Sequence, residues 1–236
     1  MSHAHGSRKI PRKYQPKGFE IVHEDDDIIV GFKSAGILTV AAPYERERTV
    51  QHFLNEYVRK GNSRSRHVIF VVHRLDRETS GVLVFAKNPR AQEFLKDHWR
   101  ENKKIYYAVV HGRMARRSGT ISSYLIEDDK YRMHSFADGS EGKLAHTAYK
   151  VIKETDKFSL LEIDLLTGRK NQIRVHLSGE GHPLVGDDKY GHPDRRYPNL
   201  ALHARSISFT HPAHGERMTF EAPIPEHFFK LVGYQW

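Results

Sequence analysis

A charged segment between two apolar runs carries the most promising chemistry in this sequence. Residues 73–81 read HRLDRETSG and separate Val68–Val72 from Val82–Ala86. Continuous apolar runs are typical of buried strands, and a polar loop held between two such strands can present side chains rigidly. Within this loop Asp76 has an arginine on either side, which favours the ionised carboxylate. Such a group can act as a nucleophile, a general base or a metal ligand, but an Asp before Thr-Ser-Gly can also simply cap a turn.

Composition excludes several classes of protein. The 236 residues are 38% hydrophobic, which is enough for a packed core. Cysteine is absent, so disulfides, thiolate metal sites and a cysteine nucleophile are excluded. No apolar run approaches the roughly 18 residues that a membrane span needs, and residues 1–18 contain no signal-like apolar stretch. We expect a soluble, cytoplasmic protein that does not bind a membrane.

The charge balance points to a polyanionic partner. Lys and Arg number 38 against 29 Asp and Glu, which gives a net charge of +9. Phosphate contacts by such an excess release condensed counterions and favour nucleic-acid binding. The alternative is a basic but otherwise ordinary soluble enzyme.

The pattern along the chain predicts a mixed α+β domain. Residues 1–18 are basic and aperiodic, which indicates a mobile arm that either contacts RNA or is a solvated tail. Residues 19–236 contain no long linker and are predicted to form one domain. Val50–Val58 has helical spacing, and Asn88 with Pro89 is typical of a helix start. Strands are predicted at Ile28–Val30, at the two apolar runs above, and at 105–110, 145–152 and 158–166.

The segment HRLDRETSGVLVFAK (73–87) closely resembles the signature of RluA-type pseudouridine synthases. Residues 25–36, with Ser34 in place of a family Pro, are similar to that family's N-terminal strand and turn, and 104–112 to its Lys-x-Tyr-x-Ala strand. TGRKNQIRVHL (167–177) resembles the Thr-Gly-Arg-x-His-Gln-x-Arg-x-His-Leu motif, except that Asn171 stands where the family has His. Together with 181–191 and 202–212, the resemblance covers about residues 19–228.

This resemblance implies a pseudouridine synthase fold and an isomerisation. The expected fold is a large mixed, mainly antiparallel sheet with flanking helices and a central basic cleft, without the S4 RNA-binding domain that many family members carry. The expected reaction breaks the N1–C1′ bond of a uridine in tRNA or rRNA, rotates the base and joins C5 to C1′. Such a reaction needs no redox cofactor, ATP or metal. We expect RNA as the partner, no obligatory protein partner and a monomer.

The resemblance also implies roles for single residues. Asp76 matches the catalytic carboxylate, which either attacks the sugar or base or assists formation of a glycal. Tyr106 matches the active-site tyrosine that stacks on the uracil, and Arg174 the basic residue that pairs with the catalytic Asp. Tyr107, the neighbour of Tyr106, is expected in the core. The expected substrate-binding residues are Arg74, Arg169 and Leu177, with Arg74 either filling the gap left in the RNA stack or pairing with Asp76.

Other interpretations remain open at this point. The chain could be an RNA-binding protein that has lost catalysis, although the intact Asp76, Tyr106 and Arg174 argue against this. A metal-dependent nuclease could use Asp76 and Glu78, but we expect Glu78 in a solvated loop. Metal sites are not expected elsewhere: the run 25–27 is interpreted as a solvated turn, and His203, His211 and His214 have no standard zinc spacing.

Overall fold

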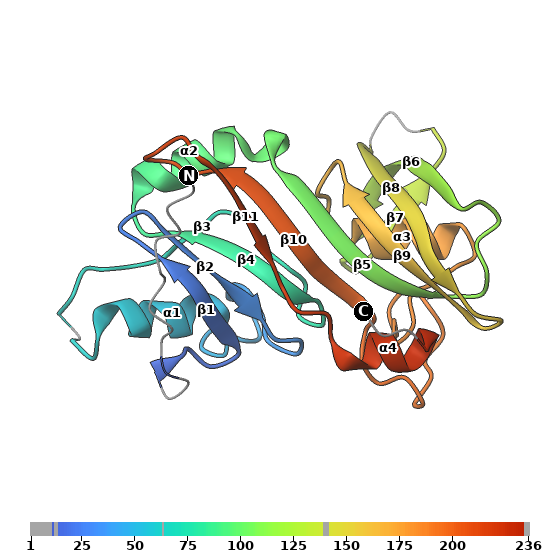
Figure 1. Cartoon of the computed structure of the whole chain (residues 1–236), viewed down its shortest axis with the longest axis horizontal. Helices are drawn as coiled ribbons and strands as arrows, with labels where there is room; N and C mark the ends of the chain where they lie inside the picture. The colour runs from blue at the N-terminus through green and yellow to red at the C-terminus, as the bar shows by residue number, and fades with distance from the viewer. Residues whose placement is uncertain (1–10, 12–13, 63, 139–141, 234–236) are drawn as a thin grey trace, which may run out of the picture. The chain divides into compact units, whose positions relative to one another are not determined.

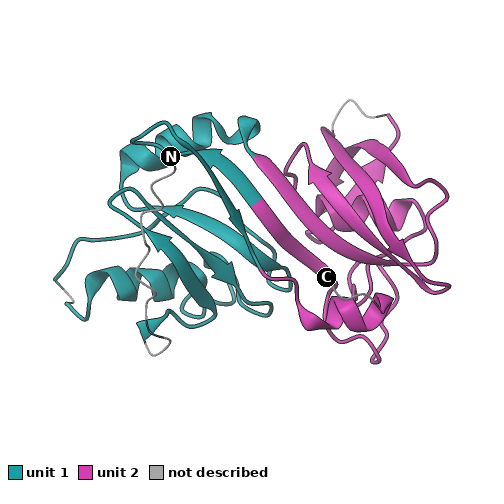
Figure 2. Cartoon of the chain, viewed as in Figure 1, with its two compact units in different colours: residues 1–102, 207–222 teal, residues 103–206, 223–236 magenta. Residues whose placement is uncertain are grey.

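The computed structural model describes residues 11, 14–62, 64–138 and 142–233 (Figure 1). The chain forms two compact units (Figure 2). Unit 1 comprises residues 1–102 and 207–222, and unit 2 comprises 103–206 and 223–236. Strand β10 (Leu202–Thr210) contributes residues to both units. The single domain expected for 19–236 stays a prediction, since a compact unit need not fold alone.

Unit 1 is built on antiparallel strands. Its strand order is β1-β2-β4, with β3 pairing β4 and β11 pairing β10. Besides the end of β10, its elements are β1 (Phe19–Glu24), β2 (Ile28–Lys33), α1 (Val50–Arg59), β3 (Phe70–Val71), β4 (Ser80–Ala86), α2 (Pro89–Asp97), the 3-10 helix η2 (Trp99–Glu101) and β11 (Arg217–Glu221).

The two apolar runs of unit 1 have different structures. Val82–Ala86 lies in β4 as predicted, with 2% or less of each residue exposed. Val68–Val72 was predicted to be a buried strand as well, and this is wrong, because only Phe70 and Val71 form β3. The N–H of Ile69 instead donates to Asn55 Oδ1 over 2.7 Å, and its carbonyl accepts a bond from Gln51. Side chains of α1 therefore replace a strand partner along the first half of the run.

Both helices predicted in unit 1 are confirmed, and each begins at a side-chain cap. Thr49 Oγ1 accepts the N–H of His52 at 3.0 Å at the start of α1. Asn88 Oδ1 accepts the N–H of Ala91 at 2.8 Å, with Pro89 at the first helical position of α2. Such caps satisfy backbone donors that have no partner inside the helix.

Described residues of the predicted arm form hydrogen bonds with the strand region that follows it. Gln15 accepts the N–H of Ile21 at 2.8 Å and donates back to the Ile21 carbonyl at 3.3 Å. The Gly18 carbonyl accepts a bond from Ser34 N–H. The remainder of the arm, residues 1–10 and 12–13, lies outside the described residues.

Unit 2 is also an antiparallel sheet with helices. Its strand order is β5-β9-β8-β6-β7. Besides the start of β10, its elements are β5 (Lys103–His111), β6 (Ser118–Glu127), β7 (Met133–Phe136), β8 (Lys143–Glu154), β9 (Phe158–Leu165), α3 (Gln172–Gly179) and α4 (Glu226–Val232). The strands predicted at 105–110, 145–152 and 158–166 are confirmed within one or two residues, and so is the α+β class.

The described core of unit 2 includes two separate apolar clusters. One joins β5 and β9 to α4 and consists of Tyr107, Val109, Phe158, Leu160, Val185, Ala201, Phe228 and Val232. Tyr107 is therefore a core residue, as predicted. The second lies at α3 and contains Leu125, Met133, Ala145, Val175 and Tyr190. None of the helices in the described ranges has the length and apolar character that crossing a membrane requires.

Candidate active site

Asp76 lies in the loop between β3 and β4 of unit 1 and is half-buried. The residue before it, Leu75, is 4% exposed, and Thr39 holds both of its backbone polar groups. The Thr39 hydroxyl donates to the Leu75 carbonyl at 2.9 Å and accepts the Leu75 N–H at 3.1 Å. On the other side, the Asp76 carbonyl accepts the N–H of Thr79 at 3.2 Å. Because the backbone is fixed on both sides, the direction of the Asp76 side chain is restricted.

A buried lysine holds the second half of the same loop. Lys33 is 2% exposed, and its ammonium donates to the carbonyls of Ser34 and Ile37 at 2.8 Å and of Arg77 at 3.0 Å. The Arg77 carbonyl also accepts the N–H of Gly36. Burial lowers the pKa of Lys33 to about 7. The negative charges of Glu78 and Asp76 raise the pKa but only partly offset this effect. The turn after β2 and the Asp76 loop are thus one hydrogen-bonded unit.

The other polar residues of the loop divide into structural and exposed ones. His73 Nε2 accepts the N–H of Val84 at 3.0 Å, and its ring lies 4.5 Å from that of Trp99. Arg74 is exposed. Glu78 has 50% of its side chain exposed and lies 3.7 Å from Arg77, which confirms its place in a solvated loop.

Helix α3 of unit 2 is anchored by polar side chains rather than by one apolar face. Gln172 Oε1 accepts bonds from the Thr167 hydroxyl at 2.8 Å and the Arg169 N–H at 3.0 Å. Its amide donates to Thr147 Oγ1 at 2.9 Å and to the His146 carbonyl at 3.0 Å. The residues from Gln172 to Leu177 are all buried, so their pattern could not separate helix from strand.

His176 makes a second anchor for α3. It is 1% exposed and hydrogen-bonded through Nδ1 to Thr147 Oγ1 at 2.9 Å and through Nε2 to Ser123 Oγ at 3.0 Å. Burial, together with a smaller contribution from the charge of the nearby His146, lowers the pKa of His176 to about 4. The imidazole is therefore neutral at physiological pH, with both ring nitrogens bonded.

Arg174 forms a buried two-pronged ion pair with Asp187. Its Nε donates to Asp187 Oδ2 at 2.8 Å and its Nη2 to Oδ1 at 2.7 Å, with 9% and 0% of the two side chains exposed. Asp187 Oδ1 also accepts the backbone N–H groups of Lys189 and Tyr190 at 2.9 Å. This geometry fixes the guanidinium plane, since both prongs must be satisfied together.

The residue before Asp187 must be glycine. Gly186 has φ of +74°, and a Cβ at this position would lie 2.2 Å from the Asn199 carbonyl oxygen. Gly186 thus allows the turn that presents Asp187 to Arg174.

Asn171, at the N-terminus of α3, has a structural role. Its φ of 52° is left-handed, a conformation that Asn tolerates better than most residues. Its amide donates to Tyr190 Oη at 3.0 Å, and the same oxygen accepts the N–H of Met133 at 3.0 Å. Asn171 therefore links α3 to the Tyr190 turn and, through Tyr190, to β7.

The comparisons with known proteins agree with one another. The profile described as RNA pseudouridylate synthase matches residues 27–179, more than half of the chain. The chain belongs to this family.

Individual members of the RluA-type branch support the assignment. The chain is 37% identical to the uncharacterized RNA pseudouridine synthase YlyB of Bacillus subtilis, over 92% of this chain and 73% of that protein. It is 37% identical to ribosomal large subunit pseudouridine synthase D of Neisseria meningitidis, over 92% and 61%. It is 36% identical to the dual-specificity RNA pseudouridine synthase RluA of Escherichia coli, over 86% and 92%. The predicted activity class, an RNA pseudouridine synthase and hence an isomerase acting on RNA, is confirmed.

Solved structures give the same answer for the fold. The structure titled human RNA Pseudouridylate Synthase Domain Containing 4 matches with a TM-score of 0.73 at 25% identity, covering 88% of this chain and 89% of that one. The human RNA Pseudouridylate Synthase Domain Containing 1 matches with a TM-score of 0.69 at 28% identity, over 88% and 84%. The predicted pseudouridine synthase fold is confirmed.

The residues predicted for the synthase site fall into two groups. Asp76 and Arg74 share one loop of unit 1. In unit 2, Tyr106 lies on β5 with 9% of its surface exposed, opposite Ile163 of β9. The other three are Arg169, which is exposed before α3, and the buried α3 residues Arg174 and Leu177. The predicted pairing of Arg174 with Asp76 and the predicted basic cleft stay predictions.

Leu177 has the environment of a core residue. It is 0% exposed, so that in this structure it packs in the interior of unit 2. Its expected contact with substrate remains untested. Arg169, by contrast, is exposed, and its Nε donates to the Leu144 carbonyl at 3.4 Å.

Several positioning residues were not foreseen from the sequence. Lys33 was interpreted only as part of a turn, and Asp187 and Tyr190 only as part of a family-like segment. The signal for Asp187 was a carboxylate directly after the apolar residues 183–185 and a glycine, which is a position where a buried ion pair is plausible. Lys33 carried no such signal, because its partners are backbone carbonyls.

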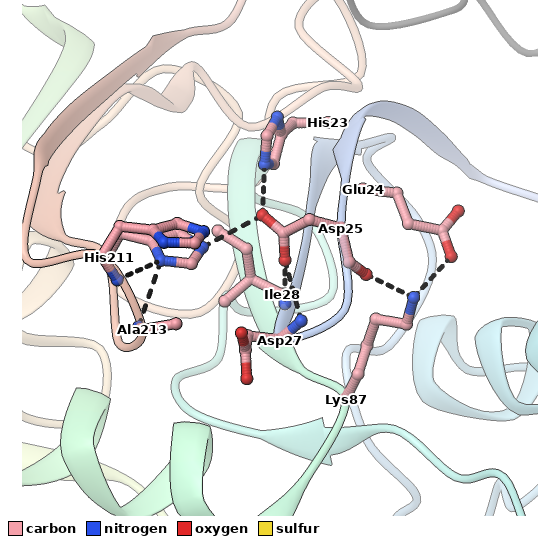
Figure 3. A network of polar contacts seen from close by, with 9 residues as sticks. His23, Glu24, Asp25, Asp27, Ile28, Lys87, His211 and Ala213 are labelled. Atoms are coloured by element: carbon pink, nitrogen blue, oxygen red, sulfur yellow. Dashed lines mark hydrogen bonds and ion pairs between the residues drawn. The ribbon is translucent and has the colours of Figure 1, made fainter. Parts of the chain in front are cut away.

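One cluster in unit 1 has the composition of a metal site. Asp25, Asp27 and His211 bring one ligand atom each within 4.8 Å of one another (Figure 3). His211 Nε2 lies 3.0 Å from Asp25 Oδ2, and His23 Nε2 lies 2.7 Å from the same oxygen. Burial alone would raise the pKa of Asp25, but the bond from His23, the backbone N–H groups of Ile28 and Asp27, and the bond from His211 together hold it well below its usual value.

The protonation of His211 favours a hydrogen-bonded network over a metal site. His211 Nδ1 accepts the backbone N–H groups of Ala213 and His214, each at 3.2 Å. The ring proton must then be on Nε2, where it is donated to Asp25. A metal would need that nitrogen deprotonated. The run 25–27 is therefore a bonded turn and not only a solvated one: it ties the β1–β2 connection to the β10–β11 connection (Figure 3).

Replacing Asp25 tests this network. Asp25→Ala removes the acceptor of four hydrogen bonds and is expected to lower the free energy of unfolding by on the order of 2 kcal/mol. Urea unfolding followed by circular dichroism measures the loss. EDTA and added Zn²⁺ should leave the wild-type unfolding midpoint unchanged. A rise of that midpoint with Zn²⁺, lost in Asp25→Ala, would favour the metal site instead.

The buried His176 predicts a pH dependence of stability. Its folded pKa of about 4 lies below the ordinary 6.5, so the unfolded chain binds a proton that the native protein excludes between these values. Stability should therefore fall as the pH drops from 7 to 4, with about 2–3 kcal/mol from this residue. The variant His176→Gln keeps hydrogen-bonding groups but cannot titrate, and its unfolding free energy should vary less with pH. Equal slopes in the two proteins would contradict this role.

Removing the charge of only one partner of the Arg174–Asp187 pair is expected to lower the free energy of unfolding strongly. Asp187→Asn removes the carboxylate that takes both prongs of a buried guanidinium and should cost about 3–5 kcal/mol of unfolding free energy. The double variant Arg174→Met/Asp187→Leu removes both charges and should lose less than Asp187→Asn alone. Denaturant unfolding of both variants measures this. A double variant as unstable as the single one would show that the pair does not act as a unit.

Proposed function

We propose that this synthase converts specific uridines of structured tRNA or rRNA to pseudouridine, with Asp76 as the catalytic carboxylate acting on a base turned out of the RNA stack. The observation that carries the proposal is the position of Asp76. It is half-buried on a loop whose backbone is fixed by Thr39 before it and Lys33 after it. A catalytic group needs such restraint to keep its geometry, whereas a carboxylate in a solvated turn does not need it.

The reaction balances without any added group. The N1–C1′ bond breaks, the uracil rotates, and C5 bonds to C1′. The hydrogen lost from C5 is balanced by one gained at N1, so the product is an isomer of the substrate. Asp76 either attacks the sugar or base, or removes a sugar proton to form a glycal. One carboxylate suffices in each case, whereas a hydrolase usually needs a second one to activate water.

The other site residues have supporting roles in this proposal. Tyr106 stacks on the everted uracil, and base–aromatic stacking contributes about 1–3 kcal/mol. Arg174 supplies positive charge to the catalytic carboxylate, with its plane set by Asp187. Arg74, which is exposed, fills the space that the target base leaves. Arg169 and Leu177 complete the substrate-binding set.

Base eversion has a cost that the protein must offset. Taking a base out of folded RNA costs a few kcal/mol. Lysines and arginines that contact phosphates can offset it, and the net charge of +9 supplies them. Because the partner is a cellular RNA, we also propose a cytoplasmic protein, active as a monomer without an obligatory protein partner.

Tritium release tests the catalytic role of Asp76. RNA carrying [5-³H]uridine loses its label when C5 bonds to C1′. Wild-type protein should release tritium, and Asp76→Ala and Asp76→Asn should reduce the rate by at least about a thousandfold, since the reacting carboxylate is gone.

Glu78→Gln is the matched control, because it alters an exposed carboxylate of the same loop. Its rate should be close to wild type. Release by Asp76→Asn at the wild-type rate would refute the proposal, and cleaved RNA chains would indicate a nuclease.

A further inference from the structure

The turn between β6 and β7 exposes the ring of Tyr131, and this residue has an unfavourable backbone conformation. Tyr131 has φ of 59°, a left-handed conformation that is unfavourable for a bulky residue, and it is 72% exposed. Asp128 builds the turn by accepting the N–H groups of Lys130 and Arg132 at 2.9 and 2.8 Å. Gly or Asn would suit this position better. Since the ring is not packed in the core, burial does not explain the tyrosine.

Two lysines reach the same residue, Lys170 from just before α3 and Lys189 from the turn that contains Asp187 and Tyr190. Lys189 Nζ donates to the Tyr131 carbonyl at 2.9 Å, and Lys170 Nζ lies 3.5 Å from the same oxygen. Lys170 Nζ is also 5.5 Å from the centroid of the Tyr131 ring and pairs with Glu127. Positive charge is thus concentrated around an exposed aromatic face.

A second tyrosine extends this cluster inward. The ring of Tyr190 has Arg132 at 5.0 Å, Arg174 at 5.3 Å and Lys189 at 5.4 Å from its centroid. Lys189 is therefore shared by the exposed Tyr131 and the buried Tyr190. The surface made by Tyr131, Arg132, Lys170 and Lys189, here called the Tyr131 surface, continues into the Arg174–Asp187 pair.

The chemistry of the Tyr131 surface fits RNA better than an acidic protein. Two carboxylates of the turn already have partners, since Asp128 bonds the turn and His134 and Glu127 bonds Lys170, while Asp129 is exposed. Acidic side chains of a protein would pair with the lysines but make no use of an exposed ring. A single-stranded nucleotide offers both a phosphate and a base face.

We propose that the Tyr131 surface binds an unpaired nucleotide of the RNA substrate other than the reacting uridine, with its base stacked on Tyr131 and its phosphates at Lys170 and Lys189. This inference rests on the proposed action on structured RNA, whose loops contain unpaired bases. It assigns the surface to substrate binding and not to the chemical step.

Binding of a labelled oligonucleotide tests the proposal. The probe is a fluorescein-labelled single-stranded RNA of about 12 nucleotides, within the range that single-strand sites cover. Tyr131→Asn removes the ring with a residue that tolerates the left-handed backbone, so its folding should be preserved. Its affinity should fall about tenfold, as expected for one stacked base. Tyr131→Phe should bind like wild type.

Tyr44→Asn is the matched control, because Tyr44 is 75% exposed in unit 1. It should leave affinity unchanged. The double variant Lys170→Gln/Lys189→Gln should reduce the slope of log affinity against log salt by about 1.4, which corresponds to two phosphates of a single strand. Wild-type affinity of Tyr131→Asn, an equal loss in Tyr44→Asn, an unchanged salt slope or equal competition by polyglutamate would each overturn the inference.

The tritium assay separates this inference from the proposed function. Tyr131→Asn should raise KM for the RNA and leave kcat near wild type, because the chemical step does not involve the ring. If Asp76→Asn were fully active, the catalytic proposal would fail while the binding results stood. If Asp76→Asn were inactive and Tyr131→Asn bound normally, only the present inference would fail.

Discussion

The buried ammonium of Lys33 is the interaction on which the Asp76 loop depends. A lysine with 2% of its surface exposed is costly unless its donors are satisfied, and here three backbone carbonyls accept them. Two of these carbonyls belong to the turn after β2 and one to Arg77, so a single cation joins segments far apart in the sequence. A hydrophobic side chain could fill the same space but could not specify the positions of three carbonyl oxygens. The loop geometry therefore follows from the need to satisfy one charge.

The same physical constraint sets helix α3 in unit 2. Its buried residues include Gln172, Arg174 and His176, whose polar groups bond to Thr147, Ser123, Asp187 and backbone atoms. Buried polar groups that are fully bonded cost little, whereas one wrong partner leaves an uncompensated dipole or charge. This makes the helix less tolerant of rotation or sliding than an apolar helix would be. Arg174, which the proposed function assigns to the catalytic carboxylate, lies on this helix and shares its restraint.

Local patterns predicted the elements well and the long-range partners poorly. The helix at Val50–Val58, the cap at Asn88 and the strand at Val82–Ala86 follow from periodicity and capping, which are properties of short segments. The Val68–Val72 run was misjudged because its backbone partners are side chains of α1, which hydrophobicity does not reveal. The family resemblance predicts Asp76, Tyr106 and Arg174 as site residues. It did not reveal Asp187 or Lys33 as supports, since such partners become visible only when the chain is folded.

The basic residues of the chain differ in burial, and this separates those that fix the geometry of the protein from those that can contact RNA. Lys33 and Arg174 are buried, and their charges are taken up by carbonyls and by Asp187, so they act on geometry and contribute little to long-range attraction. Lys170, Lys189 and Arg169 lie near the surface around α3, where positive charge meets solvent and can displace counterions from RNA. A substitution of a buried cation should therefore change stability or the chemical step, and one of an exposed cation should change affinity and its salt dependence. The basic residues thus form a buried group and an exposed group with separable effects. Helix α3 carries Arg174 of the buried group and directly follows Arg169 and Lys170 of the exposed one.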